Sequence, residues 1–265
     1  MPGFLGLDIQ TKPAWGLGVD PDEPIARGLY AYWPLAEGMG VFAGDVKGGN
    51  NLTLNGTTSW GPGPDGYAIS IPGNATSYLQ TSQNIFDPLT NDLTAALWFN
   101  AAATGTQQTL LQQLDGTGTG RNWLFITTSR QLATSIGGVN TVSATNVITA
   151  GNWYRAMVTT LGTTITLYLN GVQVATSSHA AEANIAELRL GVSKTAGNIF
   201  TGQFGKGGIP LWNRALTAGE ALRDYQEQSC LLLGPAVRRF YTVPSAAAFH
   251  TWYIGRGSAL GGGML

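Results

Sequence analysis

The sequence WYRAMVTTLGTTITLYLNGVQVATS, residues 153–177, decides the fold. In its middle part apolar side chains alternate with polar ones, at Ile165, Leu167 and Leu169. This period of two is typical of a strand with one buried face. Asn170-Gly171 follows at once and suits a tight type I′ turn, after which the chain returns from Val172. The stretch predicts an antiparallel meander, and a second sheet must cover its apolar face.

The same alternation continues on both sides of the meander. In residues 93–100 (LTAALWFN) one face carries Leu93, Ala95, Leu97 and Phe99, and the other carries Thr94, Ala96 and Trp98. Further short strands are expected at residues 27–35, 52–54, 67–71, 77–81, 109–114, 123–128, 131–136 and 187–192. About twelve short strands separated by turn residues predict an all-β, two-sheet antiparallel jelly-roll sandwich.

One short helix is expected near the end of the sandwich. Thr217 is a good N-cap, and Glu220 three residues later completes a capping-box pattern. Ala221, Leu222 and Tyr225 would then face the sheet. Arg214 and Glu220 are interpreted as structural residues that fix this helix against the sandwich.

Composition limits the classes of function. The 265 residues carry a net charge of −1 and only 11% charged residues, so no basic field favours nucleic acid or an anionic membrane. The single cysteine, Cys230, excludes an intramolecular disulfide and a cysteine-built zinc site. Neither a signal-peptide pattern nor an apolar run near the ~20 residues of a membrane helix is present in the sequence.

Three segments are expected: an N-terminal arm at residues 1–24, the sandwich domain at 25–228 and a C-terminal arm at 229–265. The first arm has a charge of −3 and the second a charge of +3, and neither shows a regular period. Their exposed apolar and basic side chains predict assembly contacts at Phe4, Leu5, Leu7, Trp15, Arg238, Arg239, Phe240, Tyr241, Trp252 and Tyr253. Exchange between subunits of a homo-oligomer such as a trimer would bury them; the alternative is that both arms fold back over their own sandwich.

Catalysis is not expected from these residues. Glycosidases need two carboxylates about 5–9 Å apart, and the only acids two positions apart are Asp20 and Asp22 in the proline-rich arm. His179 and His250 stand without a nucleophile motif. The protein is therefore expected not to be an enzyme.

The sequence offers two candidate ligand sites. Asp45 with Asn50 or Asn51 offers oxygen ligands for calcium, but one carboxylate is few for an ion that takes six or more oxygens, so a metal-free asparagine turn is preferred and no cofactor is expected. Thr94, Trp98 and Tyr168 form a candidate glycan face on the open side of a curved sheet. The alternative is that these side chains fill the space beneath a covering segment or a neighbouring subunit.

Several blocks resemble the laminin-G-like, concanavalin-A-like jelly-roll family over about residues 27–228. They are residues 32–38 (YWPLAEG), 44–46 (GDV), 48–50 (GGN), 96–99 (ALWF), 167–171 (LYLNG) and 211–217 (LWNRALT), with Trp153 at the start of its strand. The resemblance implies two antiparallel sheets, one of them curved, and allows calcium at Asp45. The chain departs from the family at residues 203–210 (QFGKGGIP), where glycines and Pro210 predict a bulge or an edge in place of a continuous strand.

The arms resemble those of tailed-bacteriophage proteins that carry this domain, through residues 3–12 (GFLGLDIQTK), 24–29 (PIARGL) and 238–240 (RRF). This resemblance implies a virion structural protein, assembled in the host cytoplasm. The first hypothesis is a capsid decoration or cement protein whose arms contact other copies and the major capsid protein. The alternative is a carbohydrate-binding or receptor-binding fibre or adhesin module that recognises surface glycans with the open sheet face.

Overall fold

The structure is a computed structural model that describes residues 18–81, 92–114, 121–136, 138–179, 187–228 and 230–232. All of them fall in a compact unit that spans Met1–Pro235. They form seventeen short strands, one 3₁₀ turn at Pro24–Ala26 and one helix, α1 (Ala218–Gln226). No helix in this part of the chain has the length and apolar character to span a membrane.

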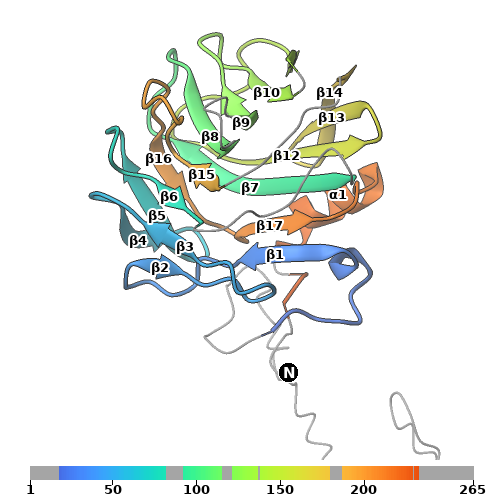
Figure 1. The fold of residues 1–265 in the computed structure, drawn as a ribbon, viewed down its shortest axis with the longest axis horizontal. Helices are drawn as coiled ribbons and strands as arrows, with labels where there is room; N and C mark the ends of the chain where they lie inside the picture. The colour runs from blue at the N-terminus through green and yellow to red at the C-terminus, as the bar shows by residue number, and fades with distance from the viewer. Residues whose placement is uncertain are drawn as a thin grey trace, which may run out of the picture. The chain divides into compact units, whose positions relative to one another are not determined.

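Two antiparallel sheets pack face to face, which confirms the predicted jelly-roll sandwich (Figure 1). The nine-stranded sheet has the order β14-β13-β12-β7-β16-β5-β4, with β17 beside β7 and β1 beside β17. Its strands are β1 (Leu29–Trp33), β4 (Ser59–Gly63), β5 (Gly66–Pro72), β7 (Leu93–Ala101), β12 (Trp153–Leu161), β13 (Thr164–Leu169), β14 (Val172–Ser178), β16 (Thr201–Phe204) and β17 (Ile209–Trp212).

The eight-stranded sheet has the order β11-β10-β9-β8-β15-β6-β3-β2. Its strands are β2 (Phe42–Ala43), β3 (Leu52–Leu54), β6 (Leu79–Gln80), β8 (Gln108–Gln113), β9 (Arg121–Ile126), β10 (Leu132–Ile136), β11 (Val139–Val142) and β15 (Leu188–Leu190). Strands β2, β4, β11, β16 and β17 were not among the predicted strands. β4 contains Pro62, a residue that argues against a strand in sequence reasoning.

The meander of residues 153–177 folds as predicted. β12, β13 and β14 pair in sequence, and the turn between the last two has positive φ at Asn170 (52°) and Gly171 (77°). Ile165, Leu167 and Leu169 lie in the core between the sheets, together with Leu93, Ala95, Leu97 and Phe99 of β7. The period of two in the sequence therefore assigned the buried face correctly.

Residues 205–208 (GKGG) form the bulge expected from the sequence. β16 ends where Phe204 faces Phe99, and β17 is in register again where Leu211 faces Ala95. Between these two pairs, six residues (205–210) lie opposite three residues of β7 (96–98), so three residues are extra. The interruption lets the sheet branch, because β16 continues to β5 whereas β17 continues to β1.

A buried ion pair joins this bulge to the helix. The Arg155 guanidinium, in β12, donates to both carboxylate oxygens of Asp224 in α1, over 2.6 and 2.7 Å. Its third donor, Nη1, bonds the carbonyl oxygen of Gly208 over 2.9 Å. Gly208 has φ +74°, and a Cβ there would lie 2.3 Å from the Trp33 carbonyl oxygen, so the bulge requires glycine at this position.

Removing one partner of this pair should destabilise the protein strongly. Asp224→Ala leaves the guanidinium of Arg155, which is 2% exposed, without a counter-charge, and we expect the free energy of unfolding in urea to fall by about 3–5 kcal/mol. Glu227→Ala is the matched control, because it breaks an exposed pair with Arg223 on the same helix and should cost less than about 1 kcal/mol. Equal losses in the two variants would show that the buried pair has no special role.

Candidate functional site

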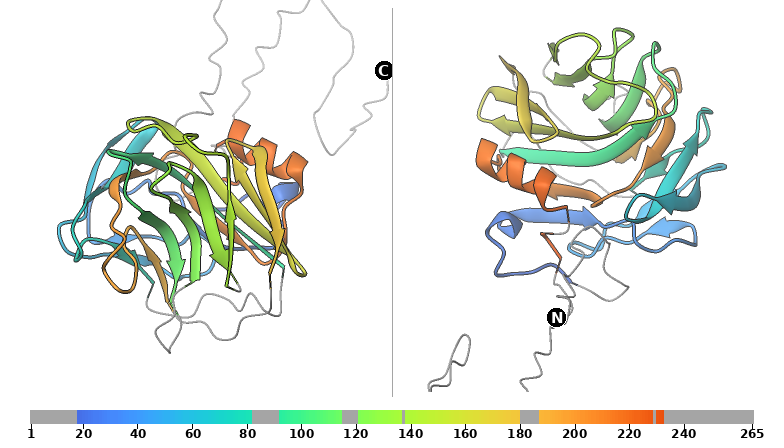
Figure 2. Two further views of the ribbon diagram at one scale, coloured as in Figure 1. Left: turned by 90° about the horizontal axis from the view of Figure 1, so that it is seen from above. Right: turned by 180° about the vertical axis from the view of Figure 1, so that it is seen from behind.

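The predicted glycan face exists, but it is covered. Thr94, Trp98 and Tyr168 lie on the side of the nine-stranded sheet that faces away from the core, as the alternation predicted. All three are buried, with Trp98 only 1% exposed. Figure 2 shows α1 alongside this surface. The prediction of an open face is therefore wrong, and the alternative of a covering segment describes the structure.

Ring contacts show why Trp98 is inaccessible. The ring of Tyr225, from α1, stacks on Trp98 with 5.6 Å between the centroids. The ammonium group of Lys206, from the bulge, lies 4.0 Å from the centroid of the same indole. Burial lowers the pKa of Lys206, and the nearby Asp65 carboxylate acts in the opposite direction. A sugar could reach this indole only if α1 and the bulge both moved.

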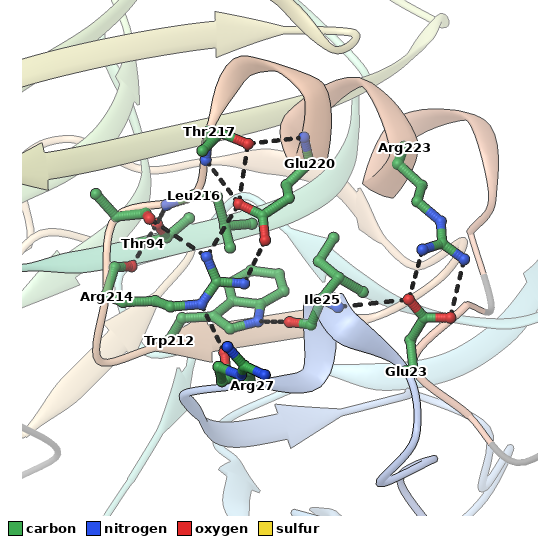
Figure 3. A network of polar contacts seen from close by, with 11 residues as sticks. Glu23, Ile25, Arg27, Thr94, Trp212, Arg214, Leu216, Thr217, Glu220 and Arg223 are labelled. Atoms are coloured by element: carbon green, nitrogen blue, oxygen red, sulfur yellow. Dashed lines mark hydrogen bonds and ion pairs between the residues drawn. The ribbon is translucent and has the colours of Figure 1, made fainter.

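Polar contacts fix the loop that leads into α1 (Figure 3). Thr94 Oγ1 donates to the Arg214 carbonyl oxygen over 2.8 Å and accepts from the Leu216 amide over 2.9 Å. The Arg214 guanidinium binds both carboxylate oxygens of Glu220, over 2.6 and 3.0 Å. Thr217 and Glu220 form the predicted capping box. The structural roles expected for Arg214 and Glu220 are confirmed.

Further contacts tie the start of the domain to the same region. Trp212 Nε1 donates to the Ile25 carbonyl oxygen over 2.7 Å, and Glu23 pairs with Arg223 of α1 over 2.6 Å. Val19 bridges to Leu232. The described ends of both predicted arms thus lie against the sandwich. The ten predicted arm residues between Phe4 and Tyr253 all lie outside the described residues.

The Asp45 loop is organised by amide donors. The two oxygens of the Asp45 carboxylate accept from the backbone amides of Tyr32, Lys47 and Asn50, over 2.9 to 3.0 Å. Its own amide donates to the Asn51 side chain. Within the described ranges no group of three or more His, Cys, Asp or Glu side chains is placed to hold a metal. The Asp45 carboxylate therefore organises this loop as an acceptor of backbone amides.

A different surface presents exposed apolar side chains at one edge of the sandwich. Residues 37–44 are here called the edge loop. A hydrogen bond of 2.6 Å from the Gly44 amide to Glu37 Oε1 joins the two ends of this loop. The ring of Tyr67, from β5, lies on Gly38, where an added Cβ would come within 2.5 Å of a ring carbon. The hydrogen bond thus ties the two ends of the loop together, and the Tyr67 ring packs on its second residue.

Two more contacts hold the middle of the edge loop. Trp60 Nε1, from β4, donates to the Gly40 carbonyl oxygen over 3.0 Å. The Leu54 amide, from β3, donates to the Val41 carbonyl oxygen over 2.8 Å. The loop, which includes β2, therefore contacts β4 of one sheet and pairs with β3 of the other.

Three exposed apolar side chains lie in this loop and a fourth lies beside its start. Met39 is 78% exposed, Val41 59% and Phe42 52%, and Tyr67 of β5, whose ring lies on Gly38, is 47% exposed; we call these four the apolar rim. Contiguous exposed apolar patches mark interaction sites.

Sequence reasoning missed the apolar rim because glycines and asparagines made residues 38–66 look like loop apart from a short strand at 52–54. One signal was present. Trp60 and Tyr67 flank Pro64-Asp65-Gly66, and an Asp-Gly pair between two aromatic segments is a hairpin pattern.

Comparison of the chain with known proteins finds a match to one family model. The family model for the concanavalin A-like lectin/glucanases superfamily, of laminin-G type, matches residues 72–221, more than half of the chain. No curated protein sequence matches.

Several solved structures share the fold. The binding domain of Paraclostridial Mosquitocidal Protein 1 has a TM-score of 0.60 at 16% identity, over 76% of this chain and 52% of that one. A Trypanosoma rangeli sialidase has 0.61 at 13%, over 76% and 33%. The binding domain of Botulinum Neurotoxin DC in complex with SialylT has 0.56 at 10%, over 77% and 52%. The chain thus spans between a third and about half of each of these chains, and the identities show a common fold alone.

Acid should weaken the network around α1 through Glu220. The hydrogen bond from Arg214 is the main cause that lowers the pKa of this carboxyl from 4.5 to about 2. The folded-state pKa lies below the unfolded one, so this contribution to stability is complete above pH 4.5 and is lost as the pH falls toward 2. In Glu220→Gln, the free energy of unfolding should depend less on pH across this window. An unchanged pH dependence, measured by urea titration at several pH values, would contradict this role.

Proposed function

The chain belongs to the concanavalin A-like lectin/glucanase superfamily, and we propose that it is a carbohydrate-binding module whose ligand docks on the apolar rim. The observation that carries the proposal is the exposure of two aromatic rings, Phe42 and Tyr67, at a loop whose backbone is hydrogen-bonded to Glu37, Trp60 and Leu54. The apolar C–H face of a sugar ring packs against aromatic rings of this kind. A preformed surface binds without the cost of ordering a loop.

The covered sheet face supports this location. A ligand on Trp98 and Tyr168 would have to displace α1, including the buried Arg155–Asp224 pair. The apolar rim needs no such rearrangement. Among the solved structures that share the fold, one is a toxin binding domain in complex with SialylT and others are sialidases. Those partners belong to those proteins, and they make glycans the first ligands to test here.

The proposal includes no catalysis. The edge loop contains one carboxylate, Glu37, and its Oε1 already accepts from the Gly44 amide. Hydrolysis of a glycosidic bond by the usual route requires a second carboxylate about 5–9 Å away. The ligand would therefore be held and released unchanged.

Capsid decoration in a phage virion stays a second proposal. It rests on the composition of the two arms, which carry charges of −3 and +3 and many aromatic residues. Its partners would be other copies of the chain and the major capsid protein. Co-sedimentation of the full chain with undecorated capsids, compared with a chain lacking residues 1–17, tests it directly.

Glycan screening followed by calorimetric titration tests the main proposal. Phe42→Ala should weaken binding of the best glycan about fivefold, because losing one stacked ring removes about 1 kcal/mol. Tyr67→Ala should weaken it at least as much, since Tyr67 also covers Gly38.

Leu161→Ala is the control, because Leu161 is an equally exposed apolar residue at the far end of β12. The Leu161→Ala variant should bind the same glycan with the affinity of the wild type. The Phe42 side chain has no hydrogen-bonding group and is half exposed, so its variant separates lost contact with the ligand from lost folding. Unchanged affinity in Phe42→Ala, or no glycan bound by the wild type, would overturn the proposal.

A further inference from the structure

The apolar rim lies in an acidic part of the chain. Residues 28–120 include the strands from β1 to β8 and contain six acids, whereas Lys47 is their only lysine or arginine. The other cations of the sequence come before residue 28 or after residue 120. The charge that a ligand meets at the rim therefore depends on which of these acids are offset by a partner.

The Glu37 carboxylate, in the edge loop, has one oxygen that is not offset. Its Oε1 accepts from the Gly44 amide. Its Oε2 is buried and has no hydrogen-bond donor among the described residues. No ion pair joins Glu37 to a lysine or arginine in the described ranges. Water and salt screen a buried charge less than an exposed one, so the field of this carboxylate extends to the rim beside it.

Two other acids near this edge are offset by their own partners. Asp45 accepts from three backbone amides and stands two residues before Lys47, the one cation of this part of the sequence. The Asp65 carboxylate accepts from the Gly207 amide and interacts with the Lys206 ammonium. Glu37 is therefore the carboxylate of this edge whose charge we expect a ligand at the rim to meet.

Arg189 lies too far from the rim to act as a counter-charge. Phe42 pairs with Thr53, Thr53 with Gln80, and Gln80 with Arg189, so three strand spacings of about 4.8 Å separate Phe42 from Arg189. Their sum exceeds the Debye length of about 8 Å at physiological salt. Gln80 also bonds both Arg189 and Glu187, which brings an acid close to this guanidinium.

We infer that the apolar rim recognises neutral glycans and discriminates against anionic ones, with Glu37 as the residue that determines this specificity. The inference rests on the glycan binding proposed above. A carboxylate or sulfate group on a ligand at Phe42 and Tyr67 would meet the field of Glu37, and the described residues of this edge offer it no arginine as a partner. Repulsion between like charges excludes one class of ligand without any new contact to the other class.

A glycan array tests the inference with the full chain. The array carries each oligosaccharide in a neutral form and in an anionic form that is sialylated, sulfated or oxidised to the uronic acid, and the best pair is then titrated by calorimetry. In low salt the wild type should bind the neutral form about threefold more tightly, as expected for two like charges roughly 10 Å apart near a protein surface. The ratio should approach one in about 1 M sodium chloride, where the Debye length is only about 3 Å.

Glu37→Gln removes the charge and keeps a side-chain oxygen that can accept from the Gly44 amide. In low salt this variant should bind the neutral and the anionic form of each pair with equal affinity. Glu227→Gln is the matched control, because it removes an exposed carboxylate from the end of α1, and it should keep the ratio of the wild type. The salt titration uses the wild type alone, so it tests the inference even if Glu37→Gln folds poorly.

The possible failures can be told apart. If the wild type binds the anionic form as tightly as the neutral form or more tightly, or if its ratio does not change with salt, the inference is wrong while glycan binding at the rim stands. The same holds if a folded Glu37→Gln keeps the ratio of the wild type. If the wild type binds no glycan on the array, the proposed function fails, and the inference fails with it.

Discussion

The buried pair between Arg155 and Asp224 is the interaction on which the rest of this sandwich depends. It joins β12 in the middle of the large sheet, α1 on its outer surface and the Gly208 carbonyl oxygen in the bulge. The same bulge accepts the Tyr32 hydroxyl at the Gly207 carbonyl oxygen and donates the Gly207 amide to Asp65. Burial accordingly raises the pKa of Tyr32. Each of these groups is buried, so each is costly to leave without its partner.

This constraint decides where a ligand can bind. Because the helix is held by a desolvated charge pair, the sheet face beneath it is part of the core, and Trp98 and Tyr168 act as packing residues. Exposed apolar side chains remain elsewhere, and four of them form the apolar rim at the edge loop.

Local patterns in the sequence predicted the strands of the sheets well. They did not predict which segments pack over the outer face of the large sheet. Alternation placed Leu167 and Leu97 in the core, Asn170-Gly171 in a turn and Thr217 at a helix start, because each of these depends on near neighbours in sequence. The burial of Trp98 depends on where α1, more than a hundred residues later, packs. The sequence does not reveal this position, because Asp224 in an amphipathic helix looks like any solvent-exposed acid. The edge loop was missed for a related reason. Trp60 and Tyr67 contact it from the hairpin of β4 and β5, and Pro62 made the first strand of that hairpin hard to recognise in the sequence.

Native-state hydrogen exchange of α1 tests the central claim most directly, namely that the helix closes the sheet face permanently. Amides 222–226 should exchange only by global unfolding, with the same free energy of opening as the amides of β7 and β12. That result would confirm that Trp98 and Tyr168 are never presented to solvent in the folded protein. Exchange of the helix amides at a free energy several kcal/mol lower would show that α1 opens as a lid, and would return the sheet face to consideration as the binding surface.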